Sequence, residues 1–228
     1  MQYLKYIDYG DSASPLKVIS LHGFPSIRSK QNREIAKGIA DELGCRVRVV
    51  LYPGLSTSGI FSFKKTIKAL VEEFPALTEG KPVGVLGHSF GGFCAILLTA
   101  NFPKLINQLV LLSPLLRFNS SVSDVTGFFT AILSDSSSEV QTLTPSQLAG
   151  EFNELSKEYA VEQLIASFEP HLKVKFMQAR NDGVTPTAIA KEFRKSFKSD
   201  FDFELVDQDH SFLIERPALA KKIAEFFR

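Results

Sequence analysis

Short apolar runs separated by longer helical stretches constrain the fold of this chain more than any other feature. The runs are rich in β-branched residues, and most are short enough for strands that are buried on both faces of a sheet. They occupy residues 17–22, 46–52, 82–88, 106–113, 172–179 and 201–207. Strands and helices in series require right-handed crossovers. The sequence therefore predicts an α/β fold with a doubly wound, mainly parallel sheet.

The helices predicted between these runs have recognisable ends. Residues 31–43 carry apolar side chains at helical spacing, and Gly44 follows them as a C-cap glycine would. Residues 60–74 form a second apolar stripe, which Pro75 is expected to end. Pro217 stands where a C-terminal helix is expected to begin.

The size and composition of the chain fit one globular domain over residues 1–228. Of these residues 44% are hydrophobic and 22% are charged, so a large core can be buried. The formal net charge of +1 does not mark the chain as a binder of nucleic acid or of membrane surfaces. Cys45 and Cys94 lack the spacing of a zinc site or a disulfide framework, so we expect reduced thiols in the core.

Nothing near the N-terminus indicates export. Residues 1–12 alternate apolar and polar side chains and lack the basic region and apolar run of a signal peptide. The longest apolar stretches lie around 94–100 and 109–113, and both are far shorter than the roughly 18 residues of a spanning helix. We therefore expect a cytoplasmic protein, a monomer or a homodimer, that uses neither a metal nor a cofactor.

Residues 114–170 interrupt the alternation of strands and helices. Helical spacing is present at 125–133 and 146–168, and the serine-rich patch at 134–139 indicates an exposed linker. The segment has two basic residues and eight acidic ones. We predict a short helical cap over the carboxyl ends of the strands, because ligands of open α/β sheets bind there. A solvated helical excursion with no role in binding is the alternative.

Ser89 stands in the sequence GHSFGG, where a strand-like run meets a helical stretch. Residues Gly87 to Gly91 match Gly-x-Ser-x-Gly in the strand, turn and helix context that this motif requires. Larger residues on either side of so tight a turn would collide with the strand and the helix. A phosphate-binding turn is the alternative, but the segment lacks the lysine and the spacing of a P-loop. Ser89 is therefore the candidate nucleophile.

A serine hydroxyl is a poor nucleophile near neutral pH, so Ser89 needs a base. The chain has four histidines. His210 follows the last strand-like run, in a loop expected at the same edge of the sheet as the serine. We expect His88 to point away from the serine, His22 to bond within its own loop and His171 to be exposed. The sequence therefore predicts His210 as the base.

Asp182 is the candidate acid that orients His210. It leaves the strand-like run at 172–179 at its carboxyl end. Asp207 and Asp209 are closer to the histidine along the chain. Neighbours in a tight loop, however, seldom present a carboxylate squarely to the ring nitrogen. The resulting order of nucleophile, acid and base along the chain is the order of one particular fold.

Four groups of segments occur in a consistent order: YIDYG with SLHGFP, then GHSFGG, then NDGVTP, then DHSF. In these segments the chain resembles the α/β-hydrolase fold superfamily, in its serine esterase and lipase branch. The resemblance implies that the backbone N–H groups of Phe24 and Phe90 form an oxyanion hole. The stretch LYPGLSTS departs from the family pattern, because Leu51 and Ser56 replace Asp and Gly. This departure bears on the subfamily and not on the triad.

The sequence predicts a serine hydrolase that cleaves a carboxylic ester or thioester through an acyl-enzyme. We expect a small or medium uncharged acyl group, because the acidic segment 114–170 disfavours an anionic substrate. A peptidase, a lyase, a cofactor-free haloperoxidase or a weakly catalytic ligand receptor on the same fold stays open. The candidate pocket residues form an apolar helical stripe, although such stripes are more often plain core. They are Phe118, Val125, Phe128, Phe129, Ile132 and Leu133.

Overall fold

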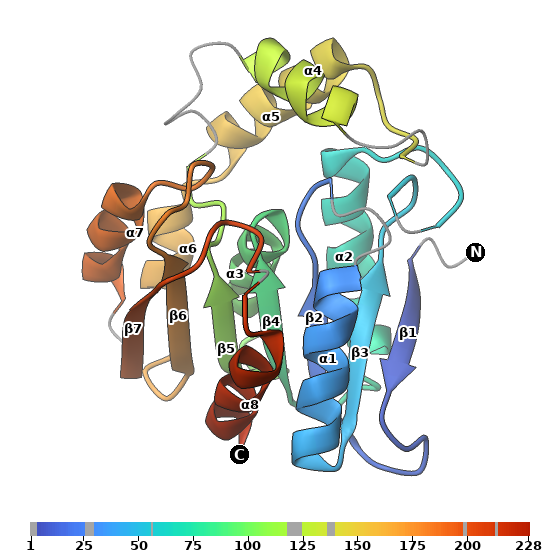
Figure 1. Ribbon diagram of the computed structural model, residues 1–228, viewed down its shortest axis with the longest axis vertical. Helices are drawn as coiled ribbons and strands as arrows, with labels where there is room; N and C mark the ends of the chain where they lie inside the picture. The colour runs from blue at the N-terminus through green and yellow to red at the C-terminus, as the bar shows by residue number, and fades with distance from the viewer. Residues whose placement is uncertain are drawn as a thin grey trace.

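Seven strands form one sheet at the centre of the protein, in the order β1-β3-β2-β4-β5-β6-β7 (Figure 1). The computed structural model describes residues 4–25, 30–55, 57–117, 125–135, 140–197, 200–212 and 214–228. The strands are β1 (Lys5–Tyr9), β2 (Leu16–Leu21), β3 (Arg46–Leu51), β4 (Val83–His88), β5 (Ile106–Leu112), β6 (Lys173–Ala179) and β7 (Asp200–Val206). β1 pairs antiparallel with β3, and the other pairings are parallel. The predicted α/β class is confirmed.

Helices cover both faces of the sheet (Figure 1). α1 (Lys30–Leu43) and α8 (Arg216–Phe227) pack against each other on one face. α2 (Phe63–Leu77), α3 (Phe90–Asn101) and α6 (Val161–Ala166) lie on the other. Each face has its own apolar cluster, as expected for a parallel sheet buried on both sides. Cys45 and Cys94 are buried free thiols within these clusters, as predicted.

Two further helices lie beyond the carboxyl ends of the strands, at the top of Figure 1. They are α4 (Val125–Asp135) and α5 (Pro145–Glu158), and both belong to segment 114–170. The last helix to name is α7 (Thr187–Phe193), which follows β6 and continues into a 3₁₀ turn at Arg194–Ser196. The sequence analysis did not predict α7.

Helix α2 differs from its prediction at both ends. The Oγ of Ser62 accepts a hydrogen bond from the backbone N–H of Lys65 at 3.1 Å, so the helix begins after this cap and leaves Ile60 exposed. The prediction that Pro75 ends the helix is wrong, since α2 runs on to Leu77. Pro75 lies in the last turn, and the neighbouring Thr78 N–H still reaches a helical carbonyl at 3.0 Å.

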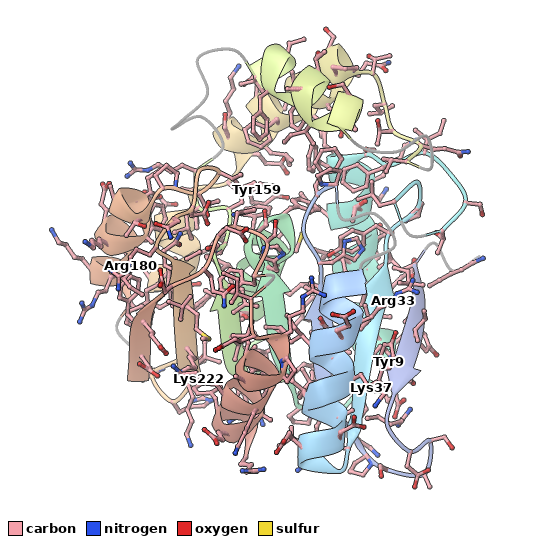
Figure 2. The ribbon with its side chains drawn as sticks, viewed as in Figure 1. Tyr9, Arg33, Lys37, Tyr159, Arg180 and Lys222 are labelled. Atoms are coloured by element: carbon pink, nitrogen blue, oxygen red, sulfur yellow. The ribbon has the colours of Figure 1, made fainter. Side chains whose placement is uncertain are left out.

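The predicted helical stretch at 146–168 forms two helices, α5 and α6. The chain is extended at Tyr159, with φ −117° and ψ 116°. The ring of Tyr159 packs edge-on against Phe93 of α3, with 5.5 Å between the ring centroids. Figure 2 labels Tyr159 at this junction between α5 and the sheet. A tertiary contact therefore interrupts a sequence that is suited to one continuous helix.

Segment 114–170 is fastened to the loop after β3 by backbone hydrogen bonds. The N–H of Gln141 donates to the carbonyl of Gly54 at 2.7 Å, and the N–H of Phe61 donates to the carbonyl of Gln141 at 2.8 Å. Gly54 has φ +79°, and a Cβ there would lie 2.0 Å from the Gln141 carbonyl oxygen. Only glycine fits this crossing of two backbones. The stretch LYPGLSTS thus acts as loop architecture that holds the segment.

Aromatic rings form a second fastening between α4 and the rest of the protein. Phe129 of α4 is 1% exposed. Its ring centroid lies 5.7 Å from that of Phe24, 5.6 Å from that of Phe63 and 5.6 Å from that of Phe152. These distances are typical of favourable ring pairs. Phe129 therefore joins α4 to α2, to α5 and to the loop after β2.

Replacement of this ring tests the packing. Phe129→Ala should lower the free energy of unfolding by about 3–4 kcal/mol, the usual cost of deleting a buried phenylalanine. Phe128→Ala is the matched control, because Phe128 is its half-buried neighbour on the same helix. Urea denaturation followed by circular dichroism measures both. Equal small losses in the two variants would show that Phe129 is not part of the core.

Candidate active site

The turn between β4 and α3 places Ser89 at the carboxyl end of the sheet. The backbone of Ser89 has φ 55° and ψ −119°, a region that non-glycine residues rarely adopt. A Cβ at Gly87 would lie 2.5 Å from the carbonyl oxygen of Gly91. A Cβ at Gly91 would lie 2.2 Å from the carbonyl oxygen of Leu21. Both glycines are therefore required for α3 to start directly against the end of β4.

Hydrogen-bond distances connect Ser89, His210 and Asp182 in a chain. The Oγ of Ser89 lies 2.9 Å from Nε2 of His210. Nδ1 of His210 lies 3.0 Å from Oδ1 and 2.9 Å from Oδ2 of Asp182. The three residues follow β4, β7 and β6, whose carboxyl ends meet at one edge of the sheet. A proton on Nδ1, donated to the carboxylate, leaves Nε2 free to accept the serine proton.

The carboxylate of Asp182 is buried and held by several donors. Its Oδ1 accepts backbone N–H bonds from Val184 at 2.8 Å and Thr185 at 2.7 Å. Its Oδ2 accepts from the Thr185 hydroxyl at 2.8 Å and from Nε2 of Gln178 at 3.2 Å. Burial opposes the charged form, but the hydrogen bond and charge of His210 outweigh it and hold the pKa of Asp182 well below its usual range.

Gln178 and Thr185 support the acid, and the sequence analysis missed both. Thr185 stands three residues after the aspartate, a spacing at which short polar side chains bond locally. Gln178 is a polar residue in a buried strand, 1% exposed. A buried amide needs partners, and this one also donates to the carbonyl of Thr185 at 2.8 Å. These two patterns are the signals that could have identified them.

The other carboxylates near His210 are directed elsewhere. Asp207 and Asp209 are both exposed. The Oδ1 of Asp209 accepts the backbone N–H of Ser211 at 2.9 Å, which closes a local turn. The side chain of Asp182, in contrast, is 0% exposed and faces Nδ1 of His210. The geometry therefore favours Asp182 as the partner of the histidine.

The remaining histidines differ in their surroundings. His22 is fully buried, and its Nδ1 donates to the Gly23 carbonyl at 2.9 Å, as expected of a residue that bonds within its loop. Burial lowers the pKa of His22 to about 4. His171 is exposed, as predicted. His88 is directed at the backbone of His210, with 2.7 Å between Nε2 and the carbonyl oxygen, a contact that the sequence analysis did not foresee.

The residues expected to form the oxyanion hole adjoin Ser89. Phe90 is the next residue and the first of α3. Phe24 follows Gly23, where an added Cβ would lie 2.9 Å from the Cβ of Ser89. The backbone on both sides of the serine is therefore close to its hydroxyl. The assignment of the two amides to an oxyanion hole stays a prediction.

The structure separates the candidate pocket residues. Phe129 is fully buried among other rings, whereas Phe128 and Leu133 are half-buried and pack against the core. Phe118 lies outside the described residues. Ser89 is 7% exposed and the His210 side chain 17% exposed, so the site opens on the serine side and is closed behind Asp182.

Within the described ranges, no cluster of three or more His, Cys, Asp or Glu side chains is arranged to hold a metal ion. No helix among these residues combines the length and the apolar character needed to cross a membrane. The expected cytoplasmic location and the monomeric or homodimeric state stay predictions.

The two buried histidines predict how stability depends on pH. Burial lowers the pKa of His22 to about 4 and that of His88 to about 3, from 6.5. Below pH 6.5 the unfolded chain therefore binds protons that the folded protein excludes. The free energy of unfolding should fall as the pH drops from 6.5 towards 4, by about 1.4 kcal/mol per pH unit for each histidine.

Urea denaturation between pH 7 and pH 4.5 measures this slope. His88→Gln should make the slope shallower by about one proton, whereas His171→Met, at an exposed histidine, should leave it as in the wild type. A flat profile in the wild type would contradict the burial of neutral histidines.

Comparisons with known proteins agree with this geometry. A family model of the alpha/beta hydrolase fold matches residues 18–135. A comparison with curated proteins finds no match. A lipase-esterase related protein from Clostridium acetobutylicum has a similar structure, with a TM-score of 0.73, 15% identity, and coverage of 98% of this chain and 99% of that one.

Two other solved structures resemble the protein over nearly its whole length. Est1E from Butyrivibrio proteoclasticus, with ferulic acid bound, has a TM-score of 0.70 at 16% identity and covers 98% of this chain and 93% of its own. A monoacylglycerol lipase from Paleococcus ferrophilus has a TM-score of 0.69 at 16% identity and covers 98% of both chains. The family model spans more than half of the sequence, and the fold agrees with it. The chain therefore belongs to the alpha/beta hydrolase fold family.

Proposed function

We propose that the protein is a serine hydrolase that cleaves carboxylic esters or thioesters through an acyl-enzyme. One observation carries this proposal: Ser89 Oγ, His210 Nε2 and Nδ1, and the Asp182 carboxylate form a continuous chain with steps of 2.9–3.0 Å. An isolated serine hydroxyl is not activated, but one bonded to an oriented histidine is. The site has the geometry that such activation requires.

The reaction begins when Ser89 attacks the acyl carbonyl and His210 takes the hydroxyl proton at Nε2. The Ser89 Oγ–carbon bond forms, and the carbonyl electron pair moves onto oxygen to give a tetrahedral intermediate. The bond to the alcohol or thiol then breaks, and His210 returns its proton to that leaving group. Water, deprotonated by the same Nε2, releases the acid and restores the serine. Asp182 keeps Nδ1 protonated throughout and stabilises the imidazolium.

The backbone N–H groups of Phe24 and Phe90 would stabilise the negative oxygen of each tetrahedral intermediate. Loss of one such donor costs about 2.7–4 kcal/mol of barrier in serine hydrolases. Support for this assignment comes from the two segments adjoining Ser89. The amide of Phe90 also opens helix α3, where backbone N–H groups lack helical acceptors and favour negative charge.

We further propose that segment 114–170 caps the site and sets the acyl preference towards small or medium uncharged groups. Its helices α4 and α5 lie beyond the carboxyl ends of the strands (Figure 1). The segment has eight acidic and two basic residues, which disfavours an anionic substrate. The similar structures include a monoacylglycerol lipase and a protein with ferulic acid bound, so the fold accommodates aliphatic and aromatic acyl groups.

Labelling with a fluorophosphonate tests the nucleophile. The wild type should take up one phosphonyl group per chain, and peptide mapping should place the group on Ser89. Ser89→Ala should take up none while keeping the wild-type circular dichroism spectrum. A folded wild type that stays unlabelled would overturn the hydrolase proposal.

Substrate class is tested by rates on nitrophenyl esters from acetate to octanoate, compared with peptide and cyanohydrin substrates. The proposal predicts ester turnover that falls off towards long chains. Faster turnover of peptides or cyanohydrins would favour a peptidase or a lyase instead. Binding of an ester without turnover would favour a ligand receptor.

Asp182→Asn should lower kcat by about 10⁴-fold, because the amide favours the wrong tautomer of His210. Asp207→Asn and Asp209→Asn remove exposed carboxylates near the same histidine and should keep kcat near the wild-type value. Steady-state rates on a nitrophenyl ester measure all three. The acid is misassigned if either control variant loses the activity in its place.

A further inference from the structure

His88 stands one residue before Ser89, and its side chain contacts the backbone that carries the catalytic histidine. Its Nε2 lies 2.7 Å from the carbonyl oxygen of His210, although the two residues are 122 positions apart. A carbonyl oxygen only accepts, so Nε2 carries the proton in this contact and Nδ1 does not. The tautomer of His88 is thereby fixed.

The ring of His88 is packed between the loops that form the site. Its centroid lies 5.1 Å from that of His210 and 5.8 Å from that of Phe212, which it meets edge to face. On its Nδ1 side, a Cβ added to Gly23 would lie 3.4 Å away. The strand β4 thus presents Ser89 to the site and the preceding side chain to the histidine loop.

His88 is built to stay neutral. Burial lowers its pKa to about 3, and a charge on His210 acts in the same direction. The other titratable groups around it are His22, which also lowers this pKa, and Asp182, which raises it only in part. A neutral donor neither repels the imidazolium that forms on His210 during the reaction nor takes its proton.

The other backbone bonds of the histidine loop do not reach β4. The N–H of Asn181 donates to the carbonyl of Gln208 at 3.2 Å, which ties the loop to the end of β6. The N–H of Phe212 donates to the carbonyl of Asp209 at 3.2 Å, within the loop. Over the described residues, the His88 bond is what joins the backbone of this loop to β4.

We propose that His88 is a positioning residue for the reaction. By holding the His210 carbonyl against the end of β4, it fixes the distance between His210 Nε2 and Ser89 Oγ. The inference rests on the proposed hydrolase function. His88 lies behind the pair and does not touch substrate, so it acts on kcat and not on substrate binding. Small displacements of a catalytic base reduce the rate strongly, which gives this bond its importance.

The test compares two substitutions of His88 that differ in hydrogen bonding. His88→Met fills the space without a donor and should lower kcat on a nitrophenyl ester about tenfold, with KM within about twofold of the wild type. His88→Gln retains a side-chain N–H and should recover most of the lost rate. His171→Met, at an exposed histidine outside the site, should match the wild type. Rates are referred to the amount of folded protein, measured by circular dichroism.

Three results would overturn the inference. One is an unchanged kcat in His88→Met. Another is an equal loss in His88→Met and His88→Gln, which would indicate packing alone. The third is a loss that lies in KM. Each of these requires an active wild type, so they are distinguishable from a failure of the proposed function, in which the wild type itself lacks esterase activity and both proposals fall.

Discussion

The left-handed backbone of Ser89 is the constraint on which the rest of the site depends. With φ 55°, the chain turns from β4 into α3 without an intervening loop, and the serine is held above the end of the sheet. Such a conformation is strained and persists only when its surroundings determine it. Here the determinants are close backbone contacts, since Gly91 lies against the Leu21 carbonyl and Gly92 against Pro114. The strands on both sides of β4 therefore shape the turn.

The parallel register of the sheet then brings the acid and the base to the serine. Asp182 follows β6 and His210 follows β7, and both strands end at the edge where β4 ends. Burying a carboxylate is unfavourable unless it is bonded. Asp182 satisfies this condition through Thr185, Gln178 and His210. A charged, fully buried acid beside an oriented imidazole is the electrostatic basis of the proposed reaction.

The catalytic residues were predictable because each stands at a position that a short sequence pattern identifies. Ser89 lies in a five-residue motif, and His210 and Asp182 follow strands with clear apolar patterns. The contact of His88 was not predictable in this way, because its partner is 122 residues away and only the tertiary structure brings them together. Phe129 shows a related limit. An apolar stripe on a helix has the same pattern whether it lines a pocket or packs in the core, and the rings around Phe129 place it in the core. The break between α5 and α6 likewise depends on a distant ring, that of Phe93.

The central claim is that Ser89 forms a covalent bond to the acyl group of the substrate. Rapid acid quench of the enzyme with a nitrophenyl ester, followed by mass spectrometry of the peptide that contains Ser89, measures this directly. The account predicts a transient mass increase equal to one acyl group on that peptide, with a matching burst of nitrophenol, and neither in Ser89→Ala. Turnover without any acylated peptide, or acylation at another residue, would contradict it.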